Sequence, residues 1–177
     1  MNYVIGDIGN TNIKLCKVDK NFKIVKTFLF NTTDINLEKD FKLVIKKIVN
    51  NKTNKTILFS SVVPNVYEKI SKIFKRNQFK VYEIKKFKLK KIMKFKLKKY
   101  SQLGSDRIAN SIGAYHKFKT NCIIIDFGTA TTFDVIKRNA IYDGGVIAPG
   151  IKLSIHNLFK STALLPMFKL DKYPKNY

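Results

Sequence analysis

Two segments far apart in the chain share one pattern, in which an apolar strand ends in aspartate and turns through glycine into a second strand. The first is Asp7-Ile8-Gly9-Asn10-Thr11, and the second is Asp126-Phe127-Gly128-Thr129-Ala130-Thr131. Internal similarity of this kind indicates a duplicated unit. Two lobes that each open with such a hairpin predict a nucleotide held in the cleft between them.

The apolar periodicity around the hairpins predicts an α/β chain. The Lys-rich stretch 85–99 alternates Lys with apolar residues and fits an extended or irregular segment better than a helix. A helix over 106–117 is expected to be capped by Ser105. We expect strands over 3–7, 12–18, 23–30, 56–60, 79–84, 121–126 (buried), 131–137 and 140–147, and helices over 37–50, 66–76, 106–117 and 151–161.

Both turns have the chemistry of a phosphate-binding loop. Glycine lets the backbone approach an anion, and exposed N–H, amide and hydroxyl groups can donate to it. Asp7 and Asp126 would repel phosphate, so a cation such as Mg²⁺ is expected to mediate. Taken alone, either hairpin also fits an ordinary Asx-type turn. The donors are Gly9, Asn10, Thr11 and Asn12 with Lys14 as a cation, and Gly128, Thr129, Thr131 and Thr132.

A third candidate site, Gly104-Ser105-Asp106-Arg107, opens the helix expected over 106–117. A helix N-terminus attracts anions, and the Arg107 fork suits a carboxylate. Asp106 would be free to accept a proton from an attacking hydroxyl. The alternative is a capped helix with a surface acid–base pair. Asp134 and Asp143, after the second hairpin, are expected to face solvent or cap a turn.

Composition narrows the function classes. The net charge of +23 over 177 residues comes overwhelmingly from Lys, whereas nucleic-acid readers lean on Arg, so nucleic-acid binding through 85–99 is the weaker interpretation. No signal peptide or membrane-spanning stretch is expected. Cys16 and Cys122 have no metal-type spacing, which predicts small reduced core residues in a cytoplasmic protein.

Five blocks, taken jointly and in order, resemble the type III pantothenate kinases. The resemblance implies an α/β, actin-like (ribonuclease H-like) two-lobe kinase fold with mixed sheets. It also implies ATP-dependent phosphorylation of pantothenate towards coenzyme A, a homodimer, Mg²⁺, and a monovalent cation, K⁺ or NH₄⁺. The blocks are DIGNTNIK (7–14), SSVVP (60–64), LGSDRIANSIGAY (103–115), IIDFGTATTFDVI (124–136) and GGVIAPGIKLS (144–154).

The resemblance also implies roles for single residues. Asp106 would be the proton acceptor, Asp126 would hold the monovalent cation, Thr129 would touch ATP, and Asp7 would lie on the Mg²⁺ side. The ATP phosphate loop would comprise Asp7, Ile8, Gly9, Asn10, Thr11, Asn12, Ile13 and Lys14. Pantothenate would be bound by Gly104, Ser105, Asp106 and Arg107.

The chain departs from the family pattern in two places. Leu97 stands where the family has a substrate-contacting tyrosine, so either Tyr100 replaces it after a local shift or that contact is lost. The family continues past residue 166 into a segment with an Asn-Thr pair, whereas this sequence stops at Tyr177. We therefore expect an N-terminal lobe over 1–117 and an incomplete C-terminal lobe over 118–177 with exposed apolar surface. A non-catalytic, nucleotide-binding or regulatory remnant is the alternative function.

Overall fold

The computed structural model describes residues 1–167, which form an α/β structure with two sheets. The first half of the chain forms β1 (Asn2–Ile8), β2 (Asn12–Val18), β3 (Ile24–Asn31), α1 (Leu37–Ile48), β4 (Thr53–Ser61), α2 (Pro64–Arg76) and β5 (Lys80–Glu83). The second half forms three 3₁₀ turns, η1 (Ile84–Lys86), η2 (Leu89–Lys91) and η3 (Tyr100–Gln102), together with β6 (Lys94–Phe95), α3 (Ser105–Phe118), β7 (Cys122–Phe127), β8 (Ala130–Lys137), β9 (Ile141–Pro149) and α4 (Ile151–Ser161).

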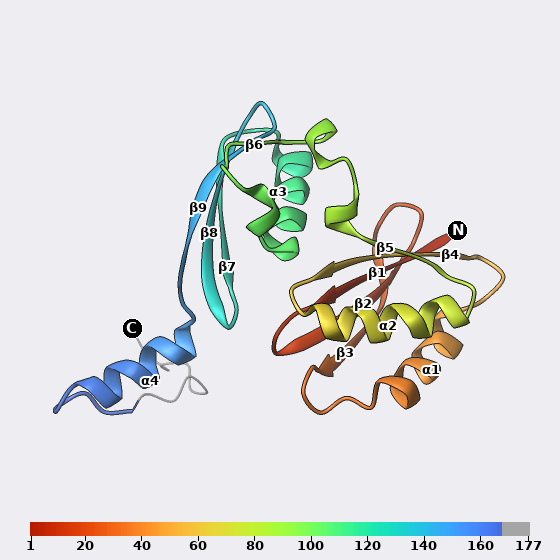
Figure 1. Ribbon diagram of the computed structural model, residues 1–177, viewed down its shortest axis with the longest axis horizontal. Helices are drawn as coiled ribbons and strands as arrows, with labels where there is room; N and C mark the ends of the chain where they lie inside the picture. The colour runs from red at the N-terminus through yellow and green to blue at the C-terminus, as the bar shows by residue number, and fades with distance from the viewer. Residues whose placement is uncertain (168–177) are drawn as a thin grey trace.

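Each sheet is mixed, and each starts from one of the two hairpins (Figure 1). The first has the order β3-β2-β1-β4-β5, with β4 and β5 parallel to β1. The second has the order β6-β9-β8-β7, with β6 parallel to β9 and the other pairs antiparallel. The hairpins β1–β2 and β7–β8 are therefore equivalent in topology, which confirms the repeat inferred from the sequence.

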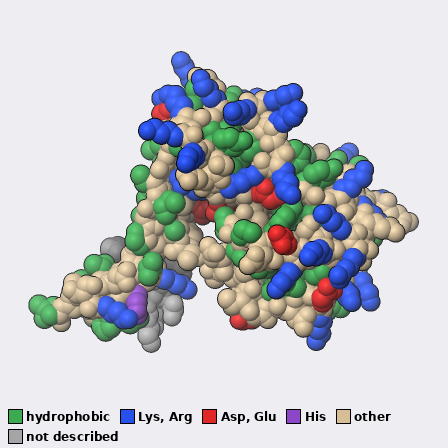
Figure 2. Space-filling view, viewed as in Figure 1, with side chains coloured by type: hydrophobic (Ala, Val, Ile, Leu, Met, Phe, Trp, Pro, Cys, Tyr) green, Lys and Arg blue, Asp and Glu red, His purple; other side chains and the backbone are tan. Residues whose placement is uncertain are grey.

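The two sheets lie in separate lobes, and α3 lies between them (Figure 1). Acidic side chains gather where the lobes meet, whereas Lys and Arg cover the outer surfaces (Figure 2). Hydrophobic side chains are scattered over the arm formed by β7–β9 and α4 (Figure 2). The junction of the lobes is therefore the place on this face where negative charge is concentrated in a strongly basic chain.

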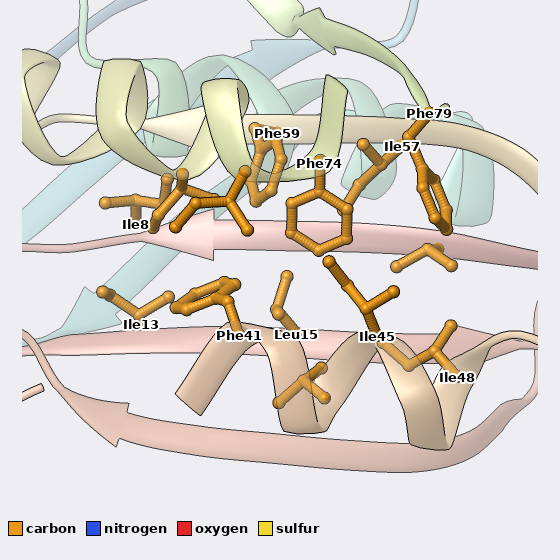
Figure 3. Close-up of a cluster of buried hydrophobic side chains, with 14 residues drawn as sticks. Ile8, Ile13, Leu15, Phe41, Ile45, Ile48, Ile57, Phe59, Phe74 and Phe79 are labelled. Atoms are coloured by element: carbon orange, nitrogen blue, oxygen red, sulfur yellow. The ribbon is translucent and has the colours of Figure 1, made fainter. Parts of the chain in front are cut away.

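The first lobe has a continuous apolar core on the face of its sheet that α1 and α2 cover (Figure 3). Helix α1 begins where Asn36 accepts a hydrogen bond from the Lys39 amide, and α2 begins at Pro64, whose fixed φ suits a first helical turn. Phe74 packs edge-on against Phe41 and Phe59, with ring centroids 5.9 Å apart in both pairs. This packing fixes the strand ends that carry the first hairpin.

The second lobe has a smaller core that includes residues from the Lys-rich segment. Leu89 and Met93 are buried with Ile108, Ile136 and Tyr142. The short strand β6 and two 3₁₀ turns, η1 and η2, are the regular elements of the segment, which confirms that it is irregular rather than helical. The division of the chain at 117–118 stays a prediction, and the second core draws on residues before it.

One face of the second sheet is apolar and exposed. The expectation of a buried strand over 121–126 was wrong, because β7 alternates between covered and open positions, and Ile123 and Ile125 are 65% and 49% exposed. Helix α4 has no buried residue. A half-covered antiparallel sheet has such an alternation whenever nothing packs on its second face.

Candidate active site at the junction of the two lobes

A cavity of about 340 Å³ lies between the end of the first hairpin, the start of α3 and the end of β7. Its polar lining residues come from five elements: Asp7 of β1, Lys14 of β2, Ser60 of β4, Asp106 and Asn110 of α3, and Asp126 of β7. Three carboxylates predicted separately from the sequence therefore meet in one cavity. They come from positions that only the tertiary fold brings together.

The first hairpin orients its side chains through strand register. Asp7 and Lys14 are cross-strand partners, so both point to the same side of the sheet. At the turn, the Gly9 amide donates to the Asn12 carbonyl at 2.9 Å. The second hairpin has a shorter turn, in which the Gly128 amide donates to the Ala130 carbonyl at 3.0 Å. Ile8 and Ile13 are fully buried, so these two predicted loop residues support the hairpin from the core.

The tips of the two hairpins touch. The hydroxyls of Thr11 and Thr129 are 2.8 Å apart, although the residues are separated by 118 positions in the chain. Asn10 and Asn12 are exposed beside them. Gly150, at the start of α4, is needed here because a side chain would come within 2.3 Å of the Thr129 carbonyl oxygen. Thr11, Thr129, Asn10 and Asn12 thus form one polar rim across both lobes. The other two predicted hydroxyl donors differ, because Thr131 is buried and the Thr132 hydroxyl is also buried.

The Asp106 carboxyl lies at the first turn of α3. Its Oδ1 accepts a hydrogen bond of 2.8 Å from the Arg107 amide and lies over Gly104, where an added Cβ would come within 2.2 Å of it. Gly104 is therefore required for this side-chain position. Gly104 is also the residue before the first helical turn, so the prediction that Ser105 caps the helix was wrong. The Ser105 hydroxyl instead donates to Glu83.

Burial and the negative charge of the cavity both raise the pKa of Asp7. Partial burial is the main cause that raises the pKa of Asp7, and the charges of Asp106 and Asp126 raise it further, while Ser60 and Lys14 oppose them. Asp126 Oδ2 accepts a hydrogen bond of 2.8 Å from Asn110 Nδ2. A cation bound among these carboxylates would relieve their mutual repulsion. Hard cations such as Mg²⁺ prefer such oxygen ligands and keep several waters, so the donors present fit that chemistry.

No group of three His, Cys, Asp or Glu residues within 1–167 is arranged to hold a metal by protein ligands alone. A cation here would take its remaining ligands from phosphate and water.

Arg107 and Tyr100 do not line this cavity. Arg107 is 9% exposed and donates through Nε and Nη2 to Asp134 Oδ1, at 2.9 and 2.7 Å. Tyr100 stacks on Phe95 with ring centroids 5.5 Å apart. The predicted pantothenate contacts of Ser105, Arg107 and Tyr100 stay predictions, and in the structure all three side chains contact other protein groups.

Three residues with buried polar groups were missed or misjudged from the sequence. Asp134 is fully buried, so the expectation that it faces solvent was wrong. Its neighbour in the same expectation, Asp143, does lie at the surface, paired with Lys96 and Lys137 at 3.0 and 2.8 Å. Ser60, in the block SSVVP, lines the cavity, and its buried hydroxyl lies beside Asp7, whose pKa it lowers. Glu83 is buried at the end of a strand, and no motif signals it.

Comparison with known proteins identifies relatives across nearly the whole chain. The family model of type III pantothenate kinases matches residues 3–176. The type III pantothenate kinase of Pelagibacter ubique (strain HTCC1062) is 42% identical over 170 residues, which are 96% of this chain and 67% of the relative. That of Sulfurihydrogenibium sp. (strain YO3AOP1) is 35% identical over 175 residues, 96% of this chain and 69% of the relative. The chain thus spans about two thirds of the length of these relatives.

Solved structures share the fold at low sequence identity. The ethanolamine utilization protein EutJ from Carboxydothermus hydrogenoformans superposes with a TM-score of 0.53 and 13% identity, covering 91% of this chain and 57% of that one. A ROK family glucokinase from Streptomyces griseus, in complex with glucose and AMPPNP, superposes with a TM-score of 0.50 and 15% identity. The match covers 82% of this chain and 46% of that one. The predicted actin-like α/β fold with two mixed sheets is confirmed.

Proposed function

The chain belongs to the type III pantothenate kinase family, and from this premise we propose that it transfers the γ-phosphoryl group of ATP to the primary hydroxyl of pantothenate. This is the first step of coenzyme A biosynthesis. The observation that carries the proposal is the meeting of Asp7, Lys14, Asp106 and Asp126 in one cavity below two touching hairpin tips.

In the proposed reaction, the hydroxyl oxygen of pantothenate attacks the γ-phosphorus, and the bond to the β-phosphate oxygen breaks. ADP leaves with that electron pair. Asp106 accepts the hydroxyl proton on Oδ2, because its Oδ1 already bonds the Arg107 amide. Lys14 and the hairpin amides offset the charge of the phosphates. Positioning and charge neutralisation supply most of the acceleration in phosphoryl transfer, and a general base adds about 10²–10⁴-fold.

We propose that Asp7 lies on the Mg²⁺ side of the bound nucleotide and that Asp126 holds a monovalent cation, K⁺ or NH₄⁺. The Asn110 amide bonds Oδ2 of Asp126 and leaves its Oδ1 without a hydrogen bond among the described residues. Bound cations would supply charge neutralisation for ATP. Thr11 and Thr129 would donate to its phosphates once their mutual contact opens.

We propose that two chains form a homodimer in the cytoplasm. The exposed apolar face of β7 supports self-association, since large apolar patches mark interaction surfaces. Both cysteines are free thiols, as a reducing compartment would keep them. No helix within residues 1–167 is long and apolar enough to cross a membrane. Light scattering, which measures molar mass, tests this proposal. We expect Phe127→Lys to form less dimer than wild type.

The experiment that tests the activity is ADP formation by purified protein with ATP, Mg²⁺, K⁺ and pantothenate. Asp106→Asn is the matched control because it keeps the shape of the side chain and its bond to the Arg107 amide. Pantothenate-dependent turnover in wild type and its loss in the control support the proposal. If both proteins bind ATP but neither turns over, the proposed kinase activity is wrong and the chain is a nucleotide-binding module.

A further inference from the structure

The two residues that flank Asp106 in the chain are tied to opposite lobes. On one side, the Ser105 hydroxyl donates to Glu83 Oε1 at 2.5 Å. Glu83 is the last residue of β5, in the first sheet. Its Oε2 accepts a hydrogen bond of 2.8 Å from the Lys85 amide. Ser105 and Glu83 are 1% and 9% exposed, so this bond is shielded from competing water.

On the other side, Arg107 is tied to the second sheet. Its Nε and Nη2 both bond Asp134 Oδ1, and the Tyr142 hydroxyl also donates to that oxygen at 2.5 Å. Burial alone would lower the pKa of Arg107, but its hydrogen bond to Asp134 and the charge of that carboxylate outweigh burial and raise it. Gly145 faces Asp134 across β8 and β9, and a Cβ there would come within 2.5 Å of Arg107 Nη2.

We propose that Glu83 and Asp134 are positioning residues for Asp106, each acting through one of its chain neighbours. This inference rests on the proposed kinase function, in which Asp106 is the base. The backbone at residue 106 is held from both lobes, and the Arg107 amide in turn fixes Oδ1 of the Asp106 carboxyl. The orientation of the base therefore depends on both lobes being in place.

Stability alone is a weaker account of this arrangement. A buried ion pair is weak evidence of net stabilisation, because desolvation offsets its attraction. Within residues 1–167, the pair here also leaves Asp134 Oδ2 buried without a hydrogen bond, which costs free energy. Neither Glu83 nor Asp134 lines the cavity, so neither contacts the reactants there. A displacement of about 1 Å at a reacting group can lower a rate by about a hundredfold. Holding Asp106 in its position would therefore increase the rate of the reaction.

The test compares kcat and KM among variants of the two acids. Glu83→Leu removes the acceptor for Ser105, whereas Glu83→Gln keeps an amide oxygen in its place. We expect Glu83→Leu and Asp134→Asn to lower kcat by roughly tenfold to a hundredfold with the KM for ATP within about twofold. Glu83→Gln should retain most of kcat. Asp143→Asn, which breaks two surface ion pairs away from α3, is the matched control and should leave kcat unchanged.

Hydrogen exchange provides a readout that needs no turnover. The amides of Arg107 and Ile108 bond Asp106 Oδ1 and the Gly104 carbonyl. Both should exchange faster in Glu83→Leu and Asp134→Asn, with β1–β2 amides unchanged. If Asp134→Asn does not fold, the double variant Arg107→Leu with Asp134→Leu removes both charges and takes its place in the exchange measurement.

The outcomes separate the two claims. Unchanged kcat per folded molecule, or unchanged exchange at the start of α3, would overturn the positioning role. A wild-type chain without pantothenate-dependent turnover would overturn the kinase function instead, and exchange alone would then decide whether the two acids hold residue 106.

Discussion

Replacing Gly145 with alanine tests the packing that surrounds the buried Arg107–Asp134 pair. A Cβ at Gly145 would lie 2.2 Å from the Phe133 carbonyl oxygen, 2.5 Å from Arg107 Nη2 and 2.8 Å from Asp134 Oδ1. The carbonyl belongs to the neighbouring strand and cannot rotate away as a flexible side chain would. Either β9 moves outward from β8 or Arg107 withdraws from Asp134.

The magnitude follows from these contacts. Overpacking a well-filled site costs about 1–3 kcal/mol, and weakening a bond to a buried charge costs a similar amount, so we expect Gly145→Ala to lower the free energy of unfolding by about 2–4 kcal/mol. Gly113→Ala is the matched control. Gly113 lies within α3, and a Cβ there would meet nothing within 4 Å. Alanine favours a helix interior over glycine by about 0.5–1 kcal/mol, so this variant should be more stable than wild type.

Urea denaturation of the three proteins measures both effects. A change in midpoint at constant slope reports stability, whereas a change in slope reports an altered folded or unfolded state. A Gly145→Ala variant as stable as wild type would refute the reasoning, because no close approach of Arg107 to β9 would then exist. A destabilised Gly113→Ala would show instead that any methyl group disturbs this lobe.

Three further predictions concern charge and hydroxyl groups. Because the pKa of Asp7 is raised above 3.8 in the folded chain, its ionised form opposes folding. Asp7→Asn should therefore raise the melting temperature at pH 7, and the difference from wild type should vanish as the pH falls below about 3.8. Tyr142→Phe, which removes a buried donor to Asp134, should lower the free energy of unfolding by about 1.5 kcal/mol in urea titrations; an unchanged value would contradict the bond. Thr11→Val and Thr129→Val should each weaken ATP binding in calorimetry without lowering the melting temperature, since both hydroxyls are exposed.

Local patterns in the sequence predicted the elements well. The strand expected over 12–18 is found with those bounds, and the helix over 151–161 likewise. Asp7, Asp106 and Asp126 could each be chosen as candidate site residues, because Asp7 and Asp126 lie near the strand ends of a repeated motif and Asp106 opens a helix. Side-chain periodicity and turn chemistry carry this information locally. That the three meet in one cavity could not be predicted.

The partners of Ser105, Arg107 and Asp134 could not be predicted in the same way. A serine before a helix fits an N-cap, and only the approach of Glu83 from another sheet shows that its hydroxyl is used elsewhere. Asp134 looked exposed because strand alternation does not say which face is buried. Gly145 had no signal beyond a pair of glycines, since its role depends on an arginine that approaches from α3.

The central claim is that Asp106, held between the two lobes, accepts the proton when ATP phosphorylates pantothenate. The most direct measurement is transfer of label from [γ-³²P]ATP to pantothenate, with wild type and Asp106→Asn compared at equal ATP occupancy. We predict labelled phosphopantothenate from wild type and a loss of about 10²–10⁴-fold in the variant. Equal transfer by both proteins, or none by a wild type that binds both substrates, would contradict the account.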